Sequence, residues 1–348
     1  MPAHWDIERD FNAILAAPQI DWQVLRRAEL LLTGGTGFIG RWLLETLVRA
    51  SDQFGLELRI TIPSRDPRSF LNRNPWFFQR GDVELIALDV ADRAPQGHFD
   101  YVIHAAADAS SLLCATNPLS VFKTIVRGTE NILTSVATNP ETKVLFLSSG
   151  AVYGQQPAEL SHIPEDWLGA PDPQLPGNTY AESKRMAETL GAIFAKQHAA
   201  RIVAARIFSL LGPLLPLDRH FAAGNFIRDA VTGQPIIVHG NGTPIRSYLY
   251  PTDLAVWLLT LLTRPAKESV YNVGSENPIS ISELASMVAT LAGNGEYSIL
   301  GHQDTGWNTG RYVPATSRIR EEFGLKETVA LESAIQQTAI AYRLSLSN

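Results

Sequence analysis

A tyrosine and a lysine stand four positions apart in the segment 180–184, which reads YAESK. On a helix this spacing places Tyr180 and Lys184 on one face, about one turn apart. An ammonium close to a phenol favours the phenolate, so we expect Lys184 to lower the pKa of Tyr180 from about 10 toward neutral pH. A tyrosine tuned in this way can give or take a proton at an alcohol or carbonyl oxygen while a hydride moves at the adjacent carbon.

A serine pair follows the apolar run 143–147, which we expect to form a buried strand. Ser148 and Ser149 would then stand at the carboxyl edge of a parallel sheet, where ligands bind in open α/β folds. A serine hydroxyl at this edge can hold the same substrate oxygen that Tyr180 protonates. By itself, the spacing of Tyr180 and Lys184 is also that of an ordinary surface pair on a helix. The serine and the glycine turn described next favour the catalytic interpretation.

A glycine-rich turn separates an expected strand over 29–33 from an expected helix over 38–50. The segment 33–40 reads TGGTGFIG and fits both the GxGxxG and the GxxGxxG spacing. Glycines let the backbone approach a pyrophosphate, and the helix N-terminus offers free N–H groups. A plain tight turn is the alternative, but the strand–turn–helix context is the one that dinucleotide binding requires. The residues expected to contact the cofactor here are Gly34, Gly35, Thr36, Gly37, Phe38, Ile39 and Gly40.

The end of the second expected strand distinguishes the two nicotinamide dinucleotides. An acidic residue there accepts from the ribose hydroxyl of NAD, whereas an arginine accommodates the 2′-phosphate of NADP. Ser64 and Arg65 occupy this position, which favours NADP(H). Asp66 follows directly, so NAD(H) stays possible. Asp89 and Val90, after the third expected strand, stand where an adenine edge would be read.

The elements that must position these residues alternate regularly along the first two thirds of the chain. This alternation predicts an α/β fold with a Rossmann-type, doubly wound parallel sheet. Beyond residue 208 glycine and proline become frequent, which predicts a smaller, mixed α/β substrate lobe over 209–348. We expect a dinucleotide domain over 29–208, joined by about 236–265, and a helical extension over 1–28. The expected strands are 29–33, 58–62, 83–88, 99–104, 143–148 and 201–208, and the expected helices are 38–50, 116–137 and 180–199.

Composition narrows the class of protein. The 348 residues, 45% of them hydrophobic, are enough for about two domains with a substantial core. The 29 basic and 35 acidic side chains give a net charge of −6, which argues against a basic surface for nucleic acid. The single cysteine, Cys114, excludes a disulfide framework or a cysteine-built zinc site, and we expect no metal. No apolar run reaches the ~18 residues of a membrane span and no secretory signal pattern is present, so we expect a cytoplasmic protein.

Six segments occur in a characteristic order: 33–40 (TGGTGFIG), 104–107 (HAAA), 128–131 (GTEN), 147–154 (LSSGAVYG), 180–184 (YAESK) and 246–250 (RSYLY). Over about residues 29–275 the chain resembles the extended short-chain dehydrogenase/reductases of the NAD(P)-dependent nucleotide-sugar epimerase/dehydratase branch. The resemblance implies that Ser149 is the catalytic serine, Tyr180 the proton donor and acceptor, and Lys184 the group that binds the nicotinamide ribose. It also implies a homodimer that pairs the helix before the fifth strand with the Tyr180 helix. The residues that would line the cofactor near the fourth strand are Ala105, Ala106 and Ala107.

The same resemblance implies a nucleotide-diphosphate sugar as substrate, held by the second lobe. Arg246 matches the arginine that contacts the diphosphate, and Arg311 offers a second cation for phosphate oxygens. Asn225 and Phe226 would face the nucleotide, with Phe226 against the base. Arg246 has the alternative of a surface salt bridge, and Arg311 and Phe226 have the alternative of a structural role.

Departures from the family pattern shape the expected reaction. Sugar-nucleotide 4,6-dehydratases carry Asp-Glu directly after the hydroxyl residue, where this chain has Gly150 and Ala151, so water elimination is disfavoured. Ile125 and Ser209 replace two asparagines of the family. The first hypothesis is NADP-dependent reduction of a 4-keto-6-deoxy sugar nucleotide, with Tyr180 as the acid. Nucleotide-sugar 4-epimerisation or UDP-glucuronate-type decarboxylation with retained NAD needs the same three residues, and a non-catalytic NADP-binding sensor or scaffold would predict that they are broken.

Overall fold

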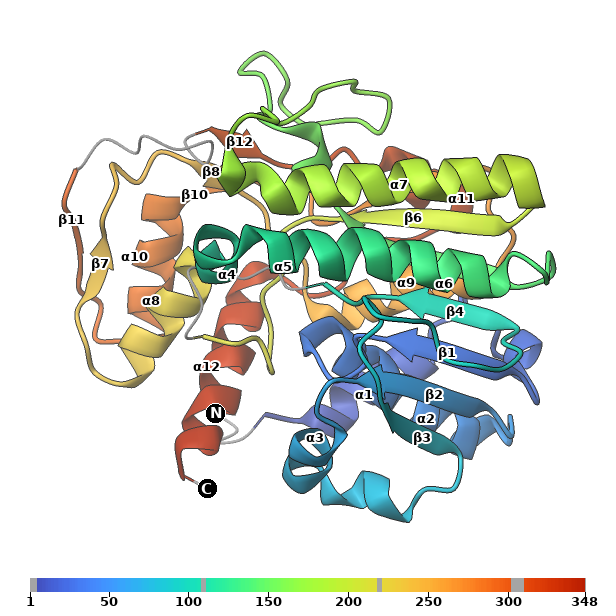
Figure 1. Ribbon diagram of the computed structural model, residues 1–348. Helices are drawn as coiled ribbons and strands as arrows, with labels where there is room; N and C mark the ends of the chain where they lie inside the picture. The colour runs from blue at the N-terminus through green and yellow to red at the C-terminus, as the bar shows by residue number, and fades with distance from the viewer. Residues whose placement is uncertain (1–4, 108–110, 218–220, 302–309, 348) are drawn as a thin grey trace.

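The computed structural model describes residues 5–107, 111–217, 221–301 and 310–347. At its centre lies a parallel sheet of seven strands in the order β3-β2-β1-β4-β5-β6-β9 (Figure 1). The predicted doubly wound sheet is confirmed, and its winding reverses between β1 and β4, where such folds bind ligands. The strands are β1 (Glu29–Thr33), β2 (Arg59–Ser64), β3 (Val83–Ala87), β4 (Tyr101–His104), β5 (Lys143–Ser149), β6 (Arg201–Ile207) and β9 (Val270–Val273).

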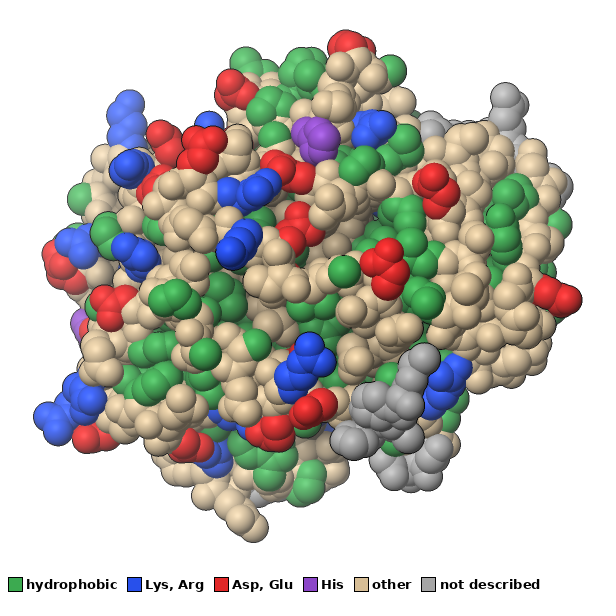
Figure 2. All heavy atoms as spheres, turned by 180° about the vertical axis from the view of Figure 1, so that it is seen from behind, with side chains coloured by type: hydrophobic (Ala, Val, Ile, Leu, Met, Phe, Trp, Pro, Cys, Tyr) green, Lys and Arg blue, Asp and Glu red, His purple; other side chains and the backbone are tan. Residues whose placement is uncertain are grey.

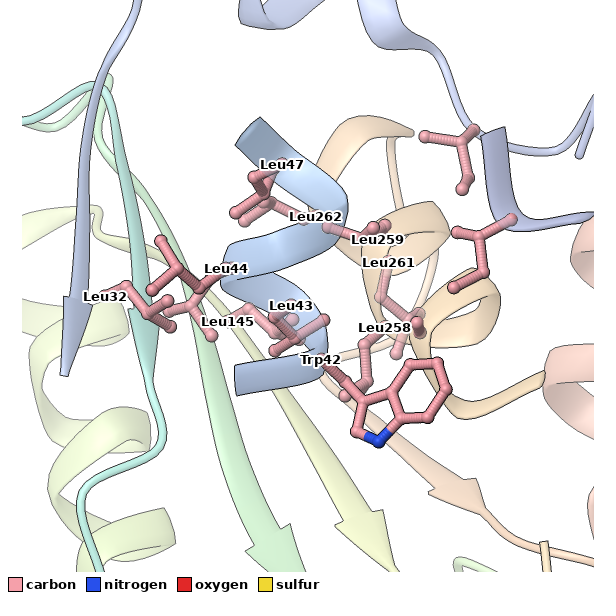
Figure 3. Close-up of a cluster of buried hydrophobic side chains, with 14 of the residues drawn as sticks. Leu32, Trp42, Leu43, Leu44, Leu47, Leu145, Leu258, Leu259, Leu261 and Leu262 are labelled. Carbon is pink, nitrogen blue, oxygen red and sulfur yellow. The ribbon is translucent and has the colours of Figure 1, made fainter. Parts of the chain in front are cut away.

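The inner strand β1 has three consecutive leucines, Leu30 to Leu32, because both of its faces are covered. Successive side chains of a strand point to opposite faces. Leu30 and Leu32 therefore join the larger core, which contains α2 (Phe38–Phe54) and α9 (Pro251–Thr263), whereas Leu31 joins a separate cluster under α6. Figure 3 shows α2 lying between strand residues such as Leu32 and the leucines of α9.

Two long helical segments cover the opposite face of the sheet. One is α7 (Thr179–His198), and the other runs from α5 (Pro118–Phe122) through the π-helical turn η3 (Lys123–Arg127) into α6 (Gly128–Val136) (Figure 1). The single helix expected over 116–137 thus contains a π turn. Ile125 lies in this turn and is fully buried, which explains why an apolar residue is accommodated there.

A second lobe lies at one end of the sheet (Figure 1). Its core packs α8 (Ala222–Val231), α10 (Ile281–Ala292) and α12 (Leu331–Ser347) together. Two small sheets accompany these helices. The first has the order β10-β8-β12, and the second pairs two parallel strands. The bounds are β10 (Ile279–Ser280), β8 (Ile245–Arg246), β12 (Arg311–Tyr312), β11 (Tyr297–Ile299) and β7 (Ile236–Val238).

The division between the lobes differs from the expected one. The chain returns to the large sheet through α9 and β9, and α11 (Ser317–Phe323) packs into the same core. The segment that we expected to return to the large sheet, about 236–265, differs from the observed one. It includes β7 and β8, which belong to the small sheets, and it ends before β9, which belongs to the large sheet. Weak propensity signals in short strands carry no information about which sheet they join.

The segment before β1 packs onto the sheet lobe. Phe11 and Ile14 of α1 (Ile7–Leu15) are fully buried in the main core, and Trp22 and Leu25 of η1 (Trp22–Leu25) are buried with them. Tyr250 donates a hydrogen bond of 2.7 Å to Asp10, so this extension is tied to the residue that precedes α9. The remaining short helices are α3 (Pro67–Arg73), η2 (Pro75–Gln79), α4 (Ser111–Thr116), η4 (Gly150–Tyr153) and η5 (Pro176–Asn178).

Acidic and basic side chains are interspersed over the face seen in Figure 2. Among the described residues, no helix is long and apolar enough to cross a membrane. Within the same ranges, no three His, Cys, Asp or Glu side chains are grouped as ligands for a metal ion.

Candidate active site

The glycine turn is built so closely that two of its glycines cannot carry a side chain. Gly34 has a φ of +68°, and a Cβ on it would lie 2.7 Å from the carbonyl of Ala105. A Cβ on Gly40 would lie 2.1 Å from the carbonyl oxygen of Gly34. Gly37 caps α2 with no side-chain hydrogen bond, so the first N–H groups of this 17-residue helix are available to an anion. These features fit the pyrophosphate of a dinucleotide.

The predicted cofactor residues near β4 meet this turn through their backbone. The N–H of Ala105 donates to the carbonyl of Thr33, and the N–H of Ala106 donates to the Thr33 hydroxyl. The run 105–107 is therefore held against the glycine turn at the β1–β4 switch point. Its side chains are partly exposed, as expected for residues that line a ligand.

At the tip of β2, Asp66 is engaged in local structure. Its carboxylate accepts from the N–H of Ser69 at 3.0 Å and so caps α3. Arg65 is exposed beside it, and the Ser64 hydroxyl accepts from the N–H of Asp66 at 3.3 Å. This arrangement leaves the guanidinium of Arg65 accessible for a 2′-phosphate, so the NADP(H) preference stays a prediction.

The two residues after β3 also make local contacts. Asp89 accepts from the N–H of Ala91 at 2.9 Å, and Val90 is buried in the cluster under α6. Their predicted contact with an adenine ring is not tested by these bonds.

Ser149, Tyr180 and Lys184 are brought together at the carboxyl end of β5. Ser149 is the last residue of that strand, and its hydroxyl is near enough to the phenol of Tyr180 on α7 to act on the pKa of that phenol. Lys184 is 2% exposed, and its Nζ donates to the carbonyl oxygen of Leu147 at 2.6 Å and lies 6.0 Å from the centre of the Tyr180 ring. The geometry suits proton transfer at an oxygen placed between the serine and the tyrosine.

The expectation that Lys184 lowers the pKa of Tyr180 is wrong for this structure. Burial raises the pKa of Tyr180 to about 12, and the hydrogen bond from Ser149 opposes this only in part. Burial also lowers the pKa of Lys184 to about 7, with the Glu188 carboxylate opposing the change. Near neutral pH the lysine is thus only partly charged and stands beside the ring, not at the hydroxyl.

Arg246 and Arg311 occupy neighbouring strands of the small sheet. Arg246 is 8% exposed, and its Nη1 donates to the carbonyl oxygens of Ile245 and Gly310. Its charge lowers the pKa of Tyr312, which burial raises. Arg311 is partly exposed and donates to the carbonyl of Ser161 at 3.4 Å. Their predicted diphosphate contacts stay predictions.

Asn225 and Phe226 differ in their accessibility on α8. Asn225 is partly exposed and accepts a 3.4 Å hydrogen bond from Arg228. Phe226 is 4% exposed and packs in the core of the second lobe. Its structural interpretation is therefore the better supported one, since a ring held among apolar side chains presents no face to a nucleotide base.

A model of the NAD dependent epimerase/dehydratase family matches residues 30–274, which include the glycine turn, Ser149, Tyr180 and Lys184. The chain belongs to this family. The expected relationship to extended short-chain dehydrogenase/reductases is thereby confirmed, and with it the expectation that the protein is an enzyme.

Known members of this epimerase/dehydratase family are similar along most of the chain. UDP-glucuronic acid decarboxylase 5 of Arabidopsis thaliana is 30% identical over 319 residues, covering 91% of this chain and 90% of the relative. The structure of UDP-glucose 4-epimerase from Thermotoga maritima with UDP-glucose superposes with a TM-score of 0.77 at 20% identity, covering 91% and 99% of the two chains. UDP-glucuronic acid 4-epimerase from Bacillus cereus, in complex with UDP-glucuronic acid and NAD, gives 0.76 at 19% identity with the same coverage. At these identities the two structures establish the fold.

One residue of the site, Tyr312 on β12, escapes the sequence analysis. The Ser149 hydroxyl acts on the pKa of its phenol, and its ring centre lies 4.5 Å from that of Phe208. A Cβ on Gly150 would meet the Phe208 ring at 2.5 Å and the Tyr312 oxygen at 2.7 Å. The position where dehydratases of the family carry Asp is therefore filled by these two side chains. The strand of Tyr312 is two residues long and 163 positions after Ser149, so no local pattern points to it.

His104 lies near the site without facing a ligand. Its ring nitrogens are hydrogen-bonded to the hydroxyls of Thr33 at 2.7 Å and Thr129 at 3.1 Å, and its ring stacks on Phe146. Burial lowers its pKa to about 3, so the imidazole is neutral. His104 is a hydrogen-bonded core histidine that ties β1 and β4 to α6.

Proposed function

We propose that this protein is a nucleotide-sugar 4-epimerase that works with a retained NAD. The observation that carries the proposal is the catalytic set itself. Ser149, Tyr180 and Lys184 converge on one strand end, while Gly150 and Ala151 supply no further acid or base. Epimerisation at C4 needs one group that moves a proton at O4 and one that holds O4, and this set contains both.

The residues of the chain divide the work at O4. When bound, the nicotinamide ring supplies the hydride acceptor and donor for C4. Tyr180 takes the proton of the C4 hydroxyl during oxidation and returns it during reduction. Ser149 donates a hydrogen bond to the same oxygen and holds it in reach of the phenol. Lys184 lies beside the Tyr180 ring, and its bond to the Leu147 carbonyl holds α7 against the end of β5.

Decarboxylation of a UDP-glucuronate-type substrate is the second candidate. The 30% identity with the Arabidopsis decarboxylase over 91% of this chain favours it. A C4 ketone beside a C5 carboxylate is a β-keto acid, which loses CO2 without an additional base. C5 must then take up a proton, and the side chains at positions 150 and 151 offer none. That absence is why epimerisation is placed first.

Both candidates are better supported than reduction of a 4-keto-6-deoxy sugar, because the relatives reported above are by name decarboxylases and epimerases. A retained dinucleotide also fits NAD, which the Bacillus structure contains. NADP(H), favoured by Ser64 and Arg65, belongs with the reductase hypothesis. An intact catalytic set argues against a non-catalytic sensor or scaffold.

Product analysis separates these reactions. The purified protein is incubated with UDP-glucose, UDP-galactose, UDP-glucuronic acid and a dTDP-4-keto-6-deoxy sugar, with and without NADPH. Interconversion of C4 epimers without added reductant supports the proposal, and Tyr180→Phe serves as the inactive control. Release of CO2 from UDP-glucuronic acid identifies a decarboxylase, and net NADPH consumption identifies a reductase. Absence of turnover with every substrate rejects the proposal.

We also propose the homodimer that the resemblance implies, with α6 and α7 at the interface. Met186 and Ile193 on α7 are 48% and 41% exposed, which is unusual for apolar side chains of that size and supports a covered face. Light scattering should give twice the chain mass of 38.2 kDa. A mass that stays at one chain at micromolar concentration would rule the dimer out.

A further inference from the structure

We infer that Glu188 is a positioning residue for Tyr180: its carboxylate binds two neighbouring strands of the sheet and thereby fixes where α7 presents the Tyr180 phenol to the C4 oxygen of the sugar. The part of this inference that concerns C4 rests on the proposed function. Glu188 stands eight residues after Tyr180 on the same helix, so it acts through α7 and not on the substrate.

The carboxylate of Glu188 accepts hydrogen bonds from two strands at once. The hydroxyl of Ser148 on β5 donates to Oε1 at 2.5 Å. The guanidinium of Arg206 on β6 donates from Nε to Oε1 at 3.0 Å and from Nη2 to Oε2 at 2.6 Å. Ser148 and Arg206 are paired in register across the two strands. One side chain of α7 is therefore bonded to adjacent positions of β5 and β6.

The ion pair within this contact is largely shielded from water. The side chains of Glu188 and Arg206 are 14% and 15% exposed. Arg206 also donates from Nη1 to the carbonyl oxygen of Glu165 at 3.2 Å, and its guanidinium carbon lies 4.6 Å from the centre of the Tyr153 ring. An exposed ion pair contributes little, whereas a buried charge that loses its partner is strongly penalised. Arg206 is thus a firmly held partner for the carboxylate.

The spacing along α7 carries this contact to the catalytic group. Tyr180, Lys184 and Glu188 follow one another at intervals of four residues, which places them on one face of the helix. Lys184 donates to the carbonyl oxygen of Leu147 at 2.6 Å, and Glu188 is bonded to the next residue of β5. Figure 1 shows α7 lying along the sheet beside β6. Two bonds to consecutive residues of β5 fix how far the helix extends past the strand, and Tyr180 lies one turn beyond them.

A loss of this contact should affect the chemical step more than binding. The nucleotide part of the substrate is expected on the second lobe at Arg246, which lies on β8 and not on α7. A shift of α7 moves Tyr180 relative to a sugar that is held from there. A displacement of about 1 Å at the reacting groups can cost about 100-fold in rate. We therefore expect Glu188 to act on kcat and to leave KM nearly unchanged.

The test replaces one oxygen of the carboxylate. Glu188→Gln keeps the shape of the side chain but has a single acceptor oxygen, so it cannot accept from Ser148 and from both nitrogens of Arg206. We expect kcat to fall about 10- to 100-fold, with KM for the sugar nucleotide changed by no more than about twofold. A kcat within about twofold of the wild-type value overturns the inference. A rise of KM as large as the loss of kcat overturns it as well.

Ser148→Ala is the milder variant, because it removes one bond and leaves the ion pair in place. Its kcat should fall about three- to tenfold, the size expected for one hydrogen bond. In a Glu188→Ala background the same substitution should change kcat by less than about twofold, because the partner of Ser148 is absent. Equal losses in the two backgrounds would overturn the inference, since Ser148 would then act independently of Glu188.

Asp253→Asn is the matched control for the loss of a buried carboxylate. Asp253 on α9 is 2% exposed and accepts from the N–H groups of Thr328 and Val329 and from the Thr328 hydroxyl. We expect a lower melting temperature and a kcat within about twofold of the wild-type value. A loss of kcat equal to that of Glu188→Gln would contradict a specific role for Glu188, because any comparable loss of stability would then have the same effect.

Crystal structures of the wild type and of Glu188→Gln give a readout that needs no substrate. The distance between the Tyr180 phenol and the Ser149 hydroxyl should differ by at least about 0.5 Å, the tolerance within which catalytic groups must be held. An unchanged distance overturns the inference. If the wild-type protein turns over none of the sugar nucleotides, the proposed function fails, and the place of α7 on the sheet still decides the positioning role.

Discussion

Lys184 donates a hydrogen bond of 2.6 Å from Nζ to the carbonyl oxygen of Leu147. The bond joins α7 to β5, so the helix that carries Tyr180 is held against the strand that ends in Ser149. The ammonium also lies 4.9 Å from the centre of the Phe146 ring. These contacts keep Lys184 in a buried place, where its pKa falls to about 7.

This buried lysine should make stability depend on pH. In the folded protein its pKa of about 7 lies below the usual 10.5, so the unfolded chain binds more protons between these values. The free energy of unfolding should therefore rise with pH across that window, by up to about 1.4 kcal/mol per pH unit from this group. Lys184→Met should flatten the rise in urea denaturation at pH 7, 8 and 9. Parallel profiles for the two proteins would show that Lys184 is not shifted.

Tyr180→Phe should abolish turnover and leave the dinucleotide in place. Removing the group that moves the proton should lower kcat by about 10²- to 10⁴-fold. The Kd for the dinucleotide, measured by fluorescence titration, should change less than about threefold. Tyr297→Phe, at a 40% exposed tyrosine of β11, should behave as wild type. Normal turnover by the Tyr180 variant would remove this residue from the mechanism.

Gly40→Ala should disrupt the dinucleotide site. The new Cβ would lie 2.1 Å from the Gly34 carbonyl oxygen, so the turn must open. We expect a loss of stability of about 1–3 kcal/mol and at least a tenfold weaker dinucleotide affinity. Gly177→Ala is the matched control, because a Cβ there has no neighbour within 4 Å. Equal affinities of the two variants would show that the turn does not bind the cofactor.

Arg65→Ala should reveal the dinucleotide preference. If the exposed guanidinium holds a 2′-phosphate, the affinity for NADPH should fall about tenfold or more while that for NADH stays the same. The NADH value is the internal control for folding. An unchanged ratio of the two affinities would contradict the NADP prediction and support NAD.

Arg246→Gln should weaken binding of the nucleotide part of the substrate. UDP is the probe, and its Kd by calorimetry should rise about tenfold or more because a charge-assisted contact to phosphate is lost. Arg246→Lys should recover part of the affinity, since lysine keeps the positive charge but cannot bind two phosphate oxygens at once as a guanidinium does. The dinucleotide Kd should be unchanged in both. Wild-type UDP affinity in Arg246→Gln would show that this arginine has a structural role, such as its bonds to the carbonyls of Ile245 and Gly310.

The sequence predicted those features of the molecule that depend on a few neighbouring residues, namely buried strands, the glycine turn and the spacing of side chains on one helix. The apolar runs of β1 and β5 need cover on both faces, and their bounds match the structure closely. The glycines at 34 and 40 are readable because turn geometry and close backbone approach admit no other residue. The spacing of Tyr180 and Lys184 on α7 is likewise a property of one helix.

The pKa of Tyr180 could not be predicted from the sequence, because it is set by the burial of the phenol, and that burial depends on neighbours from several helices and strands. The same holds for the two lobes, where strands of two or three residues choose their partners by tertiary packing. Phe226 illustrates the limit: an aromatic residue on an amphipathic helix suits a base or a core equally well, and its 4% exposure decides for the core.

The sequence by itself therefore determined the doubly wound sheet and predicted the dinucleotide turn and the three candidate catalytic residues, since the signal for each of them is local. Only the tertiary structure decided what surrounds Ser149. It brings Tyr312 from a distant two-residue strand to the site, where its phenol and the Phe208 ring fill the space beside Gly150. Contacts between residues 163 positions apart arise from the packing of the second lobe against the sheet, and no periodicity along the chain records them.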